Sequence, residues 1–184
     1  MRTSILSVLA AITATTPAFA ADNSADFVGP RAEVMVGYEN IKASVLPTNE
    51  NGVAWAGAIG YDMRLANNVI AGVDLEMGDS DNSRNLSPTL HVDTGRTLYA
   101  GGRLGYAVSP ATMIYTKAGY ANSELRLVNS GTTIYAGEVE GIRLGGGLEQ
   151  QIGSKAFVKG EYRYTNQEDT VSSHQAMAGV GIRF

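Results

Sequence analysis

The chain has 184 residues, of which 14 are basic and 18 acidic, so its formal net charge is −4, and it contains no cysteine. The length favours a single domain, the acidic balance argues against nucleic acid as a partner, and the lack of cysteine excludes disulfides and thiolate metal sites. After the first 20 residues no apolar run is long enough for a transmembrane helix, which needs about 18 residues or more.

The first 20 residues have the three parts of an export signal. Arg2 supplies a positive start, residues 5–12 form a short apolar run, and Ala18-Phe19-Ala20 fits a cleavage site of small residues. The apolar run is too short to cross a bilayer as a helix. We therefore predict a cleaved signal peptide over residues 1–20, a short polar lead over 21–29, and one structured domain over 30–184.

Eight segments then alternate apolar and polar residues with a period of two, which is typical of β-strands. They span residues 30–40, 52–65, 69–78, 96–108, 112–127, 139–151, 155–166 and 174–184. Short turns follow the second, fourth and sixth segments, at 66–68, 109–111 and 153–154. Longer polar connections follow the others, at 41–51, 79–95, 129–138 and 167–173.

This alternation of short and long connections is typical of a barrel in the outer membrane, with brief periplasmic turns and extended outer loops. An antiparallel wall in lipid must close on itself, because an open edge would leave unpaired N–H and C=O groups in hydrocarbon. The prediction is an all-β fold, a transmembrane antiparallel up-and-down β-barrel of eight strands, in which the last strand pairs with the first.

Charged residues in the cores of these segments fall on the side opposite the apolar residues. In the segment 155–166, Lys159, Glu161 and Arg163 are each two residues apart, so they share one face of the strand whichever face is taken as the inner one. A charge facing lipid at mid-bilayer costs roughly 2–4 kcal/mol, so we predict that these side chains point into the lumen. The predicted lumenal set is Glu33, Asp62, Arg64, Asp74, Glu76, Arg103, Lys117, Arg143, Glu149, Lys159, Glu161, Arg163 and Arg183.

The predicted set contains nearly equal numbers of acidic and basic side chains, which can pair almost completely, as buried charges require. An eight-stranded barrel has an interior just wide enough for side chains to fill. We therefore expect a salt-bridged, plugged lumen. A narrow pore for small solutes is the alternative.

Aromatic residues on the apolar side fall near both ends of the predicted strands. Tyr38, Trp55 and Tyr164 lie near the loop ends, and Tyr61, Tyr106 and Phe184 lie near the turn ends. Two aromatic girdles, one at each membrane interface, are expected of an outer-membrane barrel.

Five stretches of the sequence resemble a known family. They are GPRAEVMVGYE (29–39), GGRLGYAVSPATMIYTKAGY (101–120), GIRLGGGLE (141–149), FVKGEYRYTN (157–166) and the terminal HQAMAGVGIRF (174–184). Together they are similar to the small eight-stranded outer-membrane β-barrels of the opacity type, often labelled the porin family. This resemblance implies a Gram-negative outer-membrane location and a role in envelope structure or surface interaction.

The same resemblance implies several partners. Outer-membrane lipid and lipopolysaccharide would surround the wall, and the assembly machinery would read the last strand, which ends at Phe184. An unidentified surface ligand would bind the outer loops. The residues themselves show no motif for a cofactor or a metal, so we predict neither.

An enzyme that modifies lipid A is the main rival class. Nucleophilic catalysis needs a serine, a base and an orienting acid within hydrogen-bond reach, and the chain has two histidines, His91 and His174. We place His91 in the longest outer loop and His174 at the start of the last strand. The deacylase pattern has a serine two residues after the histidine, where this chain has Ala176, so we predict that the protein is not an enzyme.

A soluble carrier barrel is the third class. Such a barrel would turn its apolar residues inward and its charges outward. Alternation by itself does not say which face is inside, so this alternative depends on the structure.

Overall fold

The computed structural model describes residues 27–43, 49–81, 83–85, 90–129, 132–167 and 171–184. The predicted signal peptide and residues 21–26 lie outside this described part of the chain. No helix of the described residues is long and apolar enough to cross a membrane. The strands are β1 (Gly29–Ala43), β2 (Asn49–Ala66), β3 (Val69–Ser80), β4 (Ser83–Asn85), β5 (Leu90–Ser109), β6 (Thr112–Asn129), β7 (Thr132–Ile152), β8 (Ala156–Gln167) and β9 (Val171–Arg183).

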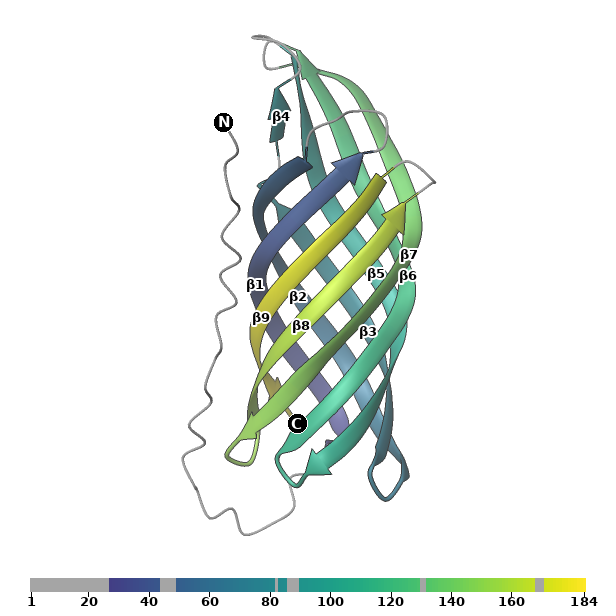
Figure 1. The fold of residues 1–184 in the computed structure, drawn as a ribbon, viewed down its shortest axis with the longest axis vertical. Coiled ribbons are helices and arrows are strands. Elements are labelled where there is room, and N and C mark those ends of the chain that lie inside the picture. The colour runs from purple at the N-terminus through teal and green to yellow at the C-terminus, as the bar shows by residue number, and fades with distance from the viewer. Residues whose placement is uncertain (1–26, 44–48, 82, 86–89, 130–131, 168–170) are drawn as a thin grey trace, which may run out of the picture.

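Eight of these strands form one closed antiparallel barrel (Figure 1). Each strand pairs with its neighbour in sequence, β3 pairs directly with β5, and β9 closes the ring against β1. The short strand β4 pairs with the first residues of β5 beyond the barrel wall. This confirms the predicted fold, including the pairing of the last strand with the first.

The stagger of the strands sets the width of the barrel. A path from Arg31 through paired residues on successive strands returns to β1 at Ile41, ten residues further along. The path passes through Gly60, Asp74, Gly101, Gly119, Arg143, Thr165 and Ser173. Eight strands with this stagger tilt by roughly 40° and enclose an interior about one layer of side chains wide. The lumen is therefore a packed space.

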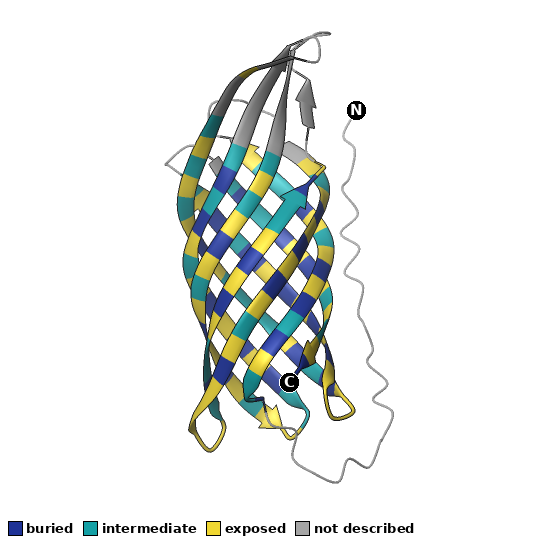
Figure 2. Ribbon diagram, turned by 180° about the vertical axis from the view of Figure 1, so that it is seen from behind, coloured by how far each residue is buried: buried dark blue, intermediate teal, exposed yellow. Residues whose placement is uncertain are grey.

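Where the burial of their side chains is described, the eight barrel strands alternate between a buried inner face and a more exposed outer face (Figure 2). The outer face carries the large apolar residues: Val73 is 62% exposed, Leu75 58% and Ile142 62%. The inner face carries the charges. The soluble-carrier alternative is wrong, because its apolar residues would have to face inward.

The strands run further than the sequence pattern predicted at the loop end of the barrel, the end opposite the three short turns. β5 begins at Leu90 and β7 at Thr132, so much of the polar connections predicted over 79–95 and 129–138 is strand. His91 accordingly lies in β5, with its backbone paired to Asn85 and Val128. A ladder in water needs only backbone hydrogen bonds and no apolar face, so alternation does not reveal it.

The outward face of the wall supports a test of the membrane orientation. Val73→Arg, at the middle of the apolar band, is expected to lower the free energy of unfolding by about 2–4 kcal/mol, because a cation there meets hydrocarbon. Leu65→Arg, near a short turn, is expected to cost at most about 1 kcal/mol. Urea titration of the protein refolded in phospholipid vesicles measures both. Equal costs at the two positions would contradict a membrane-embedded wall.

Candidate functional site

Among the described residues, fourteen charged side chains are buried in the lumen, each with at most 6% of its surface exposed. Seven are basic and seven acidic, so the charges balance. They are Arg31, Arg103, Lys117, Arg143, Lys159, Arg163, Arg183, Glu33, Glu39, Asp62, Asp74, Glu76, Glu149 and Glu161. Twelve of them belong to the predicted lumenal set, and Arg31 and Glu39 do not.

Asp62 on β2 is the centre of the group nearer the short turns. Its carboxylate accepts hydrogen bonds from Arg31 Nε at 3.1 Å, Arg103 Nε at 2.8 Å and Arg183 Nη1 at 2.6 Å. Glu149 on β7 accepts from Arg103 Nη1 at 3.0 Å and Arg183 Nη2 at 2.7 Å. Five strands, β1, β2, β5, β7 and β9, are thus joined across the lumen.

The Asp62 carboxylate fits only because its neighbour on β3 is a glycine. A Cβ atom on Gly72 would lie 2.1 Å from Asp62 Oδ1, closer than real contacts allow. The glycine in the strand therefore makes room for the charged group, which is a common reason for glycine where another group approaches closely.

Glu76 and Glu161 are the centres of a second group nearer the loop end. Glu76 accepts from Arg143 Nη1 at 3.0 Å, Arg163 Nη1 at 2.6 Å and Lys117 Nζ at 3.2 Å. Glu161 forms ion pairs with Lys117 at 3.3 Å and with Lys159 at 2.8 Å, and it also bonds Arg163. The pair between Lys159 Nζ and Glu33, at 2.8 Å, connects this group with the first through Arg31.

Two buried tyrosines fill the space between these ions. The Tyr115 hydroxyl donates to Glu161 Oε2 at 2.5 Å, and Arg103 lies 5.3 Å from the centre of its ring. Lys117 Nζ lies 4.5 Å from the centre of the Tyr99 ring. Such contacts stabilise a desolvated cation through the ring quadrupole. The sequence placed both tyrosines on the polar side of their strands without assigning them a role.

An apolar plug closes the lumen at the turn end. Phe27, only 1% exposed, packs with Ile70, Met113 and Tyr115. Gly29, with φ +110°, turns the chain between Phe27 and β1, a conformation that favours glycine. The prediction of a polar lead over 21–29 is therefore wrong at Phe27, because one aromatic residue in a polar segment has no periodic pattern to reveal it.

At the loop end of the lumen, hydroxyls and amides surround the carboxylate of Glu39. Glu39 accepts from Ser173 Oγ at 2.5 Å and Gln175 Nε2 at 2.9 Å, and Thr97 Oγ1 lies 3.0 Å from Ser123 Oγ. A cavity of about 20 Å³ next to Arg143, Arg163 and Gln175 has room for about one water molecule.

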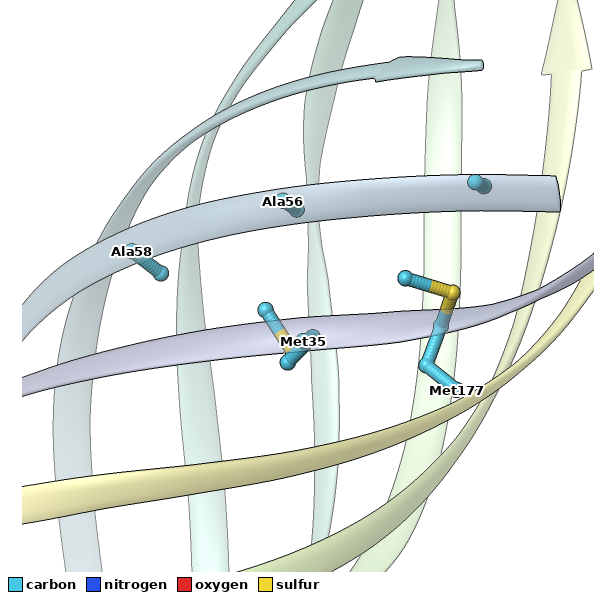
Figure 3. Packing of buried hydrophobic residues seen from close by; sticks show 5 residues of the cluster. Met35, Ala56, Ala58 and Met177 are labelled. Carbon is cyan, nitrogen blue, oxygen red and sulfur yellow. The ribbon is translucent and has the colours of Figure 1, made fainter. Parts of the chain in front are cut away.

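Part of the β2 wall is apolar on its inner side. Ala54, Ala56 and Ala58 on β2 pack against Met35 of β1 and Met177 of β9, and all five are buried (Figure 3). The Met35 sulfur also accepts a hydrogen bond from Arg163 Nη2 at 3.0 Å. The methionines therefore fill the space that the small alanines leave beside the ion network.

Arg64 lies outside the lumenal network, so its assignment to that network is wrong. The side chain is exposed, and Nη1 donates to the Asn67 carbonyl oxygen at 2.7 Å, across the turn after β2. The register shift between Arg64 and Ala66 interrupts the regular alternation there. Arg31 lies two residues before Glu33 and therefore on the same face of β1, so the sequence could have predicted that it is lumenal. It was missed because it lies at the very start of its strand.

The predicted girdle residues face outward. Tyr38, Trp55, Tyr61, Tyr106 and Phe184 are between 48% and 68% exposed, and Tyr164 is partly covered by His174, with ring centres 5.0 Å apart. The stagger of ten residues over eight strands fixes the height of each residue along the barrel axis. Tyr38, Trp55 and Tyr164 lie within about one residue of the same height, and Tyr120 does as well. The outer belt therefore includes Tyr120, which the sequence did not single out.

Comparison with known proteins places this geometry in a family. The family model described as "Outer membrane protein beta-barrel domain" matches residues 6–184. No match was found among curated proteins.

Solved structures show the same fold at low sequence identity. Neisserial surface protein A has a TM-score of 0.64 and 15% identity, over 85% of this chain and 97% of its own. Ail, the attachment invasion locus protein of Yersinia pestis, has a TM-score of 0.60 and 15% identity, over 85% and 99%. The N-terminal barrel of Pseudomonas aeruginosa OprF has a TM-score of 0.54 and 18% identity, over 83% of this chain and 97% of its own.

Removal of one lumenal cation tests the ion network. Arg103→Met is expected to lower the free energy of unfolding by about 3–5 kcal/mol, because Asp62 and Glu149 each lose a buried partner. Arg64→Met, which alters an exposed arginine, is the matched control and is expected to change stability by less than about 1 kcal/mol. Urea titration in vesicles measures both, and equal small effects would show that the pairing contributes nothing.

The absence of native cysteine allows a test of the Phe27 plug. Ile70→Cys is expected to react slowly with a water-soluble maleimide, because Phe27 covers that position, whereas Ala66→Cys at the exposed turn reacts at once. Adding Phe27→Ala to Ile70→Cys is expected to speed labelling while the protein stays folded on an unheated gel. An unchanged labelling rate in that double variant would show that Phe27 does not seal the lumen.

Proposed function

The chain belongs to the family of outer membrane protein beta-barrel domains, and from that premise we propose that it is a non-conducting barrel with an envelope-structural or surface-interaction role. The observation that carries this proposal is the filled lumen. Seven basic and seven acidic side chains are buried there and joined across the barrel, and Phe27 covers the periplasmic end. A permeating ion would have to break several buried pairs, each of which is expensive to open.

The extension of the sheet beyond the membrane supports the surface-interaction part of the proposal. β6 and β7 stay paired up to Asn129 and Thr132, whereas β8 pairs with β7 only from Gly141 onward. The backbone of residues 132–140 therefore has a ladder partner on one side among the described strands. Such an edge can accept an extended segment of another protein.

The family also gives the location, which is the Gram-negative outer membrane. We propose that residues 1–20 are a cleaved signal peptide and that the assembly machinery reads the last strand. Phe184, 68% exposed, faces outward at the end of that strand, and its backbone N–H donates to Pro30 at 2.9 Å. Outer-membrane lipid and lipopolysaccharide would surround the wall, and an unidentified surface ligand would bind the outer end.

We further propose that the protein is not an enzyme. His174 Nδ1 lies 2.6 Å from the Tyr162 hydroxyl on the outer wall, next to the Tyr164 ring. The residue two positions later is Ala176, which has no hydroxyl to act as a nucleophile. The side chain of His91 lies outside the described part of the structure. Release of fatty acids from lipid A that disappears in His174→Ala would contradict this proposal.

Conductance tests the main proposal. The refolded mature protein in a planar bilayer is expected to give no reproducible current steps, because the ion network fills its lumen. Folding is checked in the same sample by gel mobility before and after heating, and a porin of known conductance serves as the positive control. Stable current steps that change in Arg103→Ala or Lys117→Ala would overturn the proposal and favour a narrow pore for small solutes.

A further inference from the structure

We propose that the outer surface of β2, β3, β5 and β6 is a specific site for an outer-leaflet lipid whose headgroup carries a positive charge. The inference depends on the membrane-embedded wall and not on whether the lumen conducts. It rests on two features of the same flank of the barrel: an apolar groove within the wall and an acidic rim directly beyond it.

The groove has a volume of about 720 Å³, which is within the roughly 300–1,000 Å³ of typical ligand sites. Its floor is low because Gly57 and Ala100 have almost no side chain, and Leu75 and Leu98 border it. A Cβ atom on Gly57 would meet no other atom within 4 Å. Glu33, Glu76 and Tyr99 border it as well, and their side chains are buried in the lumen.

The groove lies in the half of the wall that faces the outer leaflet. Tyr120 and Asn122 border its outer end, and Tyr120 belongs to the outer aromatic belt. From that belt the groove descends to Ile59 and Leu75, which the stagger of the strands places close to the middle of the apolar band. An acyl chain in this groove would therefore come from an outer-leaflet lipid whose headgroup lies next to Tyr120 and Asn122.

Acidic side chains surround the place where that headgroup would lie. Glu140 and Glu138 are the next outward-facing residues of β7 beyond Ile142, and both are exposed. Glu140 accepts a hydrogen bond from the Tyr120 hydroxyl, and Glu138 accepts one from Asn122 Nδ2 at 3.2 Å. Both donors are neutral, so neither compensates a carboxylate charge.

The other charged groups of this rim leave it acidic. Asp79 lies on the outward side of β3, and Asp81 follows the end of that strand. Arg96 is the one base among the described side chains of β3, β5, β6 and β7 at this level. Among the described side chains of this rim, Glu138, Glu140, Asp79 and Asp81 outnumber the one base, and such an acidic excess repels an anionic headgroup and attracts a cationic one. The combination of groove and rim thus selects a cationic or amine-bearing lipid.

The fluorescence of Trp55 can report which lipid binds at this site. Trp55 is the single tryptophan of the sequence, faces outward with 48% of its surface exposed, and lies on the same side of β2 as Gly57. Its register partner on β3 is Asp79. Quenching of its fluorescence by a brominated lipid therefore reports which lipid occupies this flank.

The experiment compares two brominated lipids with identical acyl chains in phosphatidylcholine vesicles that contain the refolded mature protein. One lipid has a trimethylammonium headgroup and the other is a phosphatidylglycerol. We expect the cationic lipid to quench Trp55 at about threefold to fivefold lower mole fraction, a ratio that fits about one effective charge interaction at a membrane surface. The double variant Glu138→Gln with Glu140→Gln is expected to lose most of this preference.

Matched glycine variants test the groove itself. Gly57→Leu is expected to fill the groove and reduce quenching by the cationic lipid to the level of bulk lipid. Gly160→Leu on β8 is the control, because a Cβ there also meets nothing within 4 Å and the position lies on another flank. Gel mobility confirms folding of each variant.

Three results would overturn the proposal: equal quenching by the two lipids in the unmodified protein, stronger quenching by the phosphatidylglycerol, or a preference that survives both glutamine substitutions. Current steps in a planar bilayer would contradict the closed lumen without affecting the quenching ratio. The two proposals can therefore fail independently.

Discussion

Pairing of buried charge across a narrow lumen is the constraint on which the rest of this structure depends. Eight strands with a stagger of ten leave room for about one layer of side chains, and an unpaired ion in that space costs several kcal/mol. Asp62 meets three arginines there, and Glu76 meets two arginines and a lysine. These contacts join strands on all sides of the barrel, so the wall and its interior stabilise one another.

The two ends of the barrel differ because they serve different surroundings. At the turn end Phe27, Ile70 and Met113 form an apolar plug, and the strands stop at short turns. At the outer end the lumen is lined by hydroxyls and amides, and β5, β6 and β7 continue beyond the wall. The filled lumen supports the proposal that the protein acts at its outer surface and in the lipid around the wall, where the edge of β7 and the acidic rim above the groove lie.

The sequence predicted the barrel and most of its lumenal charges because a strand has only two faces. In β8 the residues Lys159, Glu161 and Arg163 must share a face whatever the tertiary structure, and all three are buried. The pattern failed where strands begin or bend. Arg64 lies at a register shift, Arg31 at the start of β1, and Phe27 before any strand. It also failed beyond the membrane, because pairing in water does not require an apolar face.

The sequence by itself determined which side chains share one face of a strand, since the pleat has a period of two, and burial in the closed barrel placed the charged face inside. Only the tertiary structure decided which charges meet. Lys159 and Glu33 are 126 residues apart in sequence and form a pair at 2.8 Å. They meet because the barrel is closed and only β9 lies between β8 and β1. The tertiary structure also decided that Gly57 and Ala100 lie at the floor of one groove, because the stagger of the strands, which no single strand encodes, sets their levels.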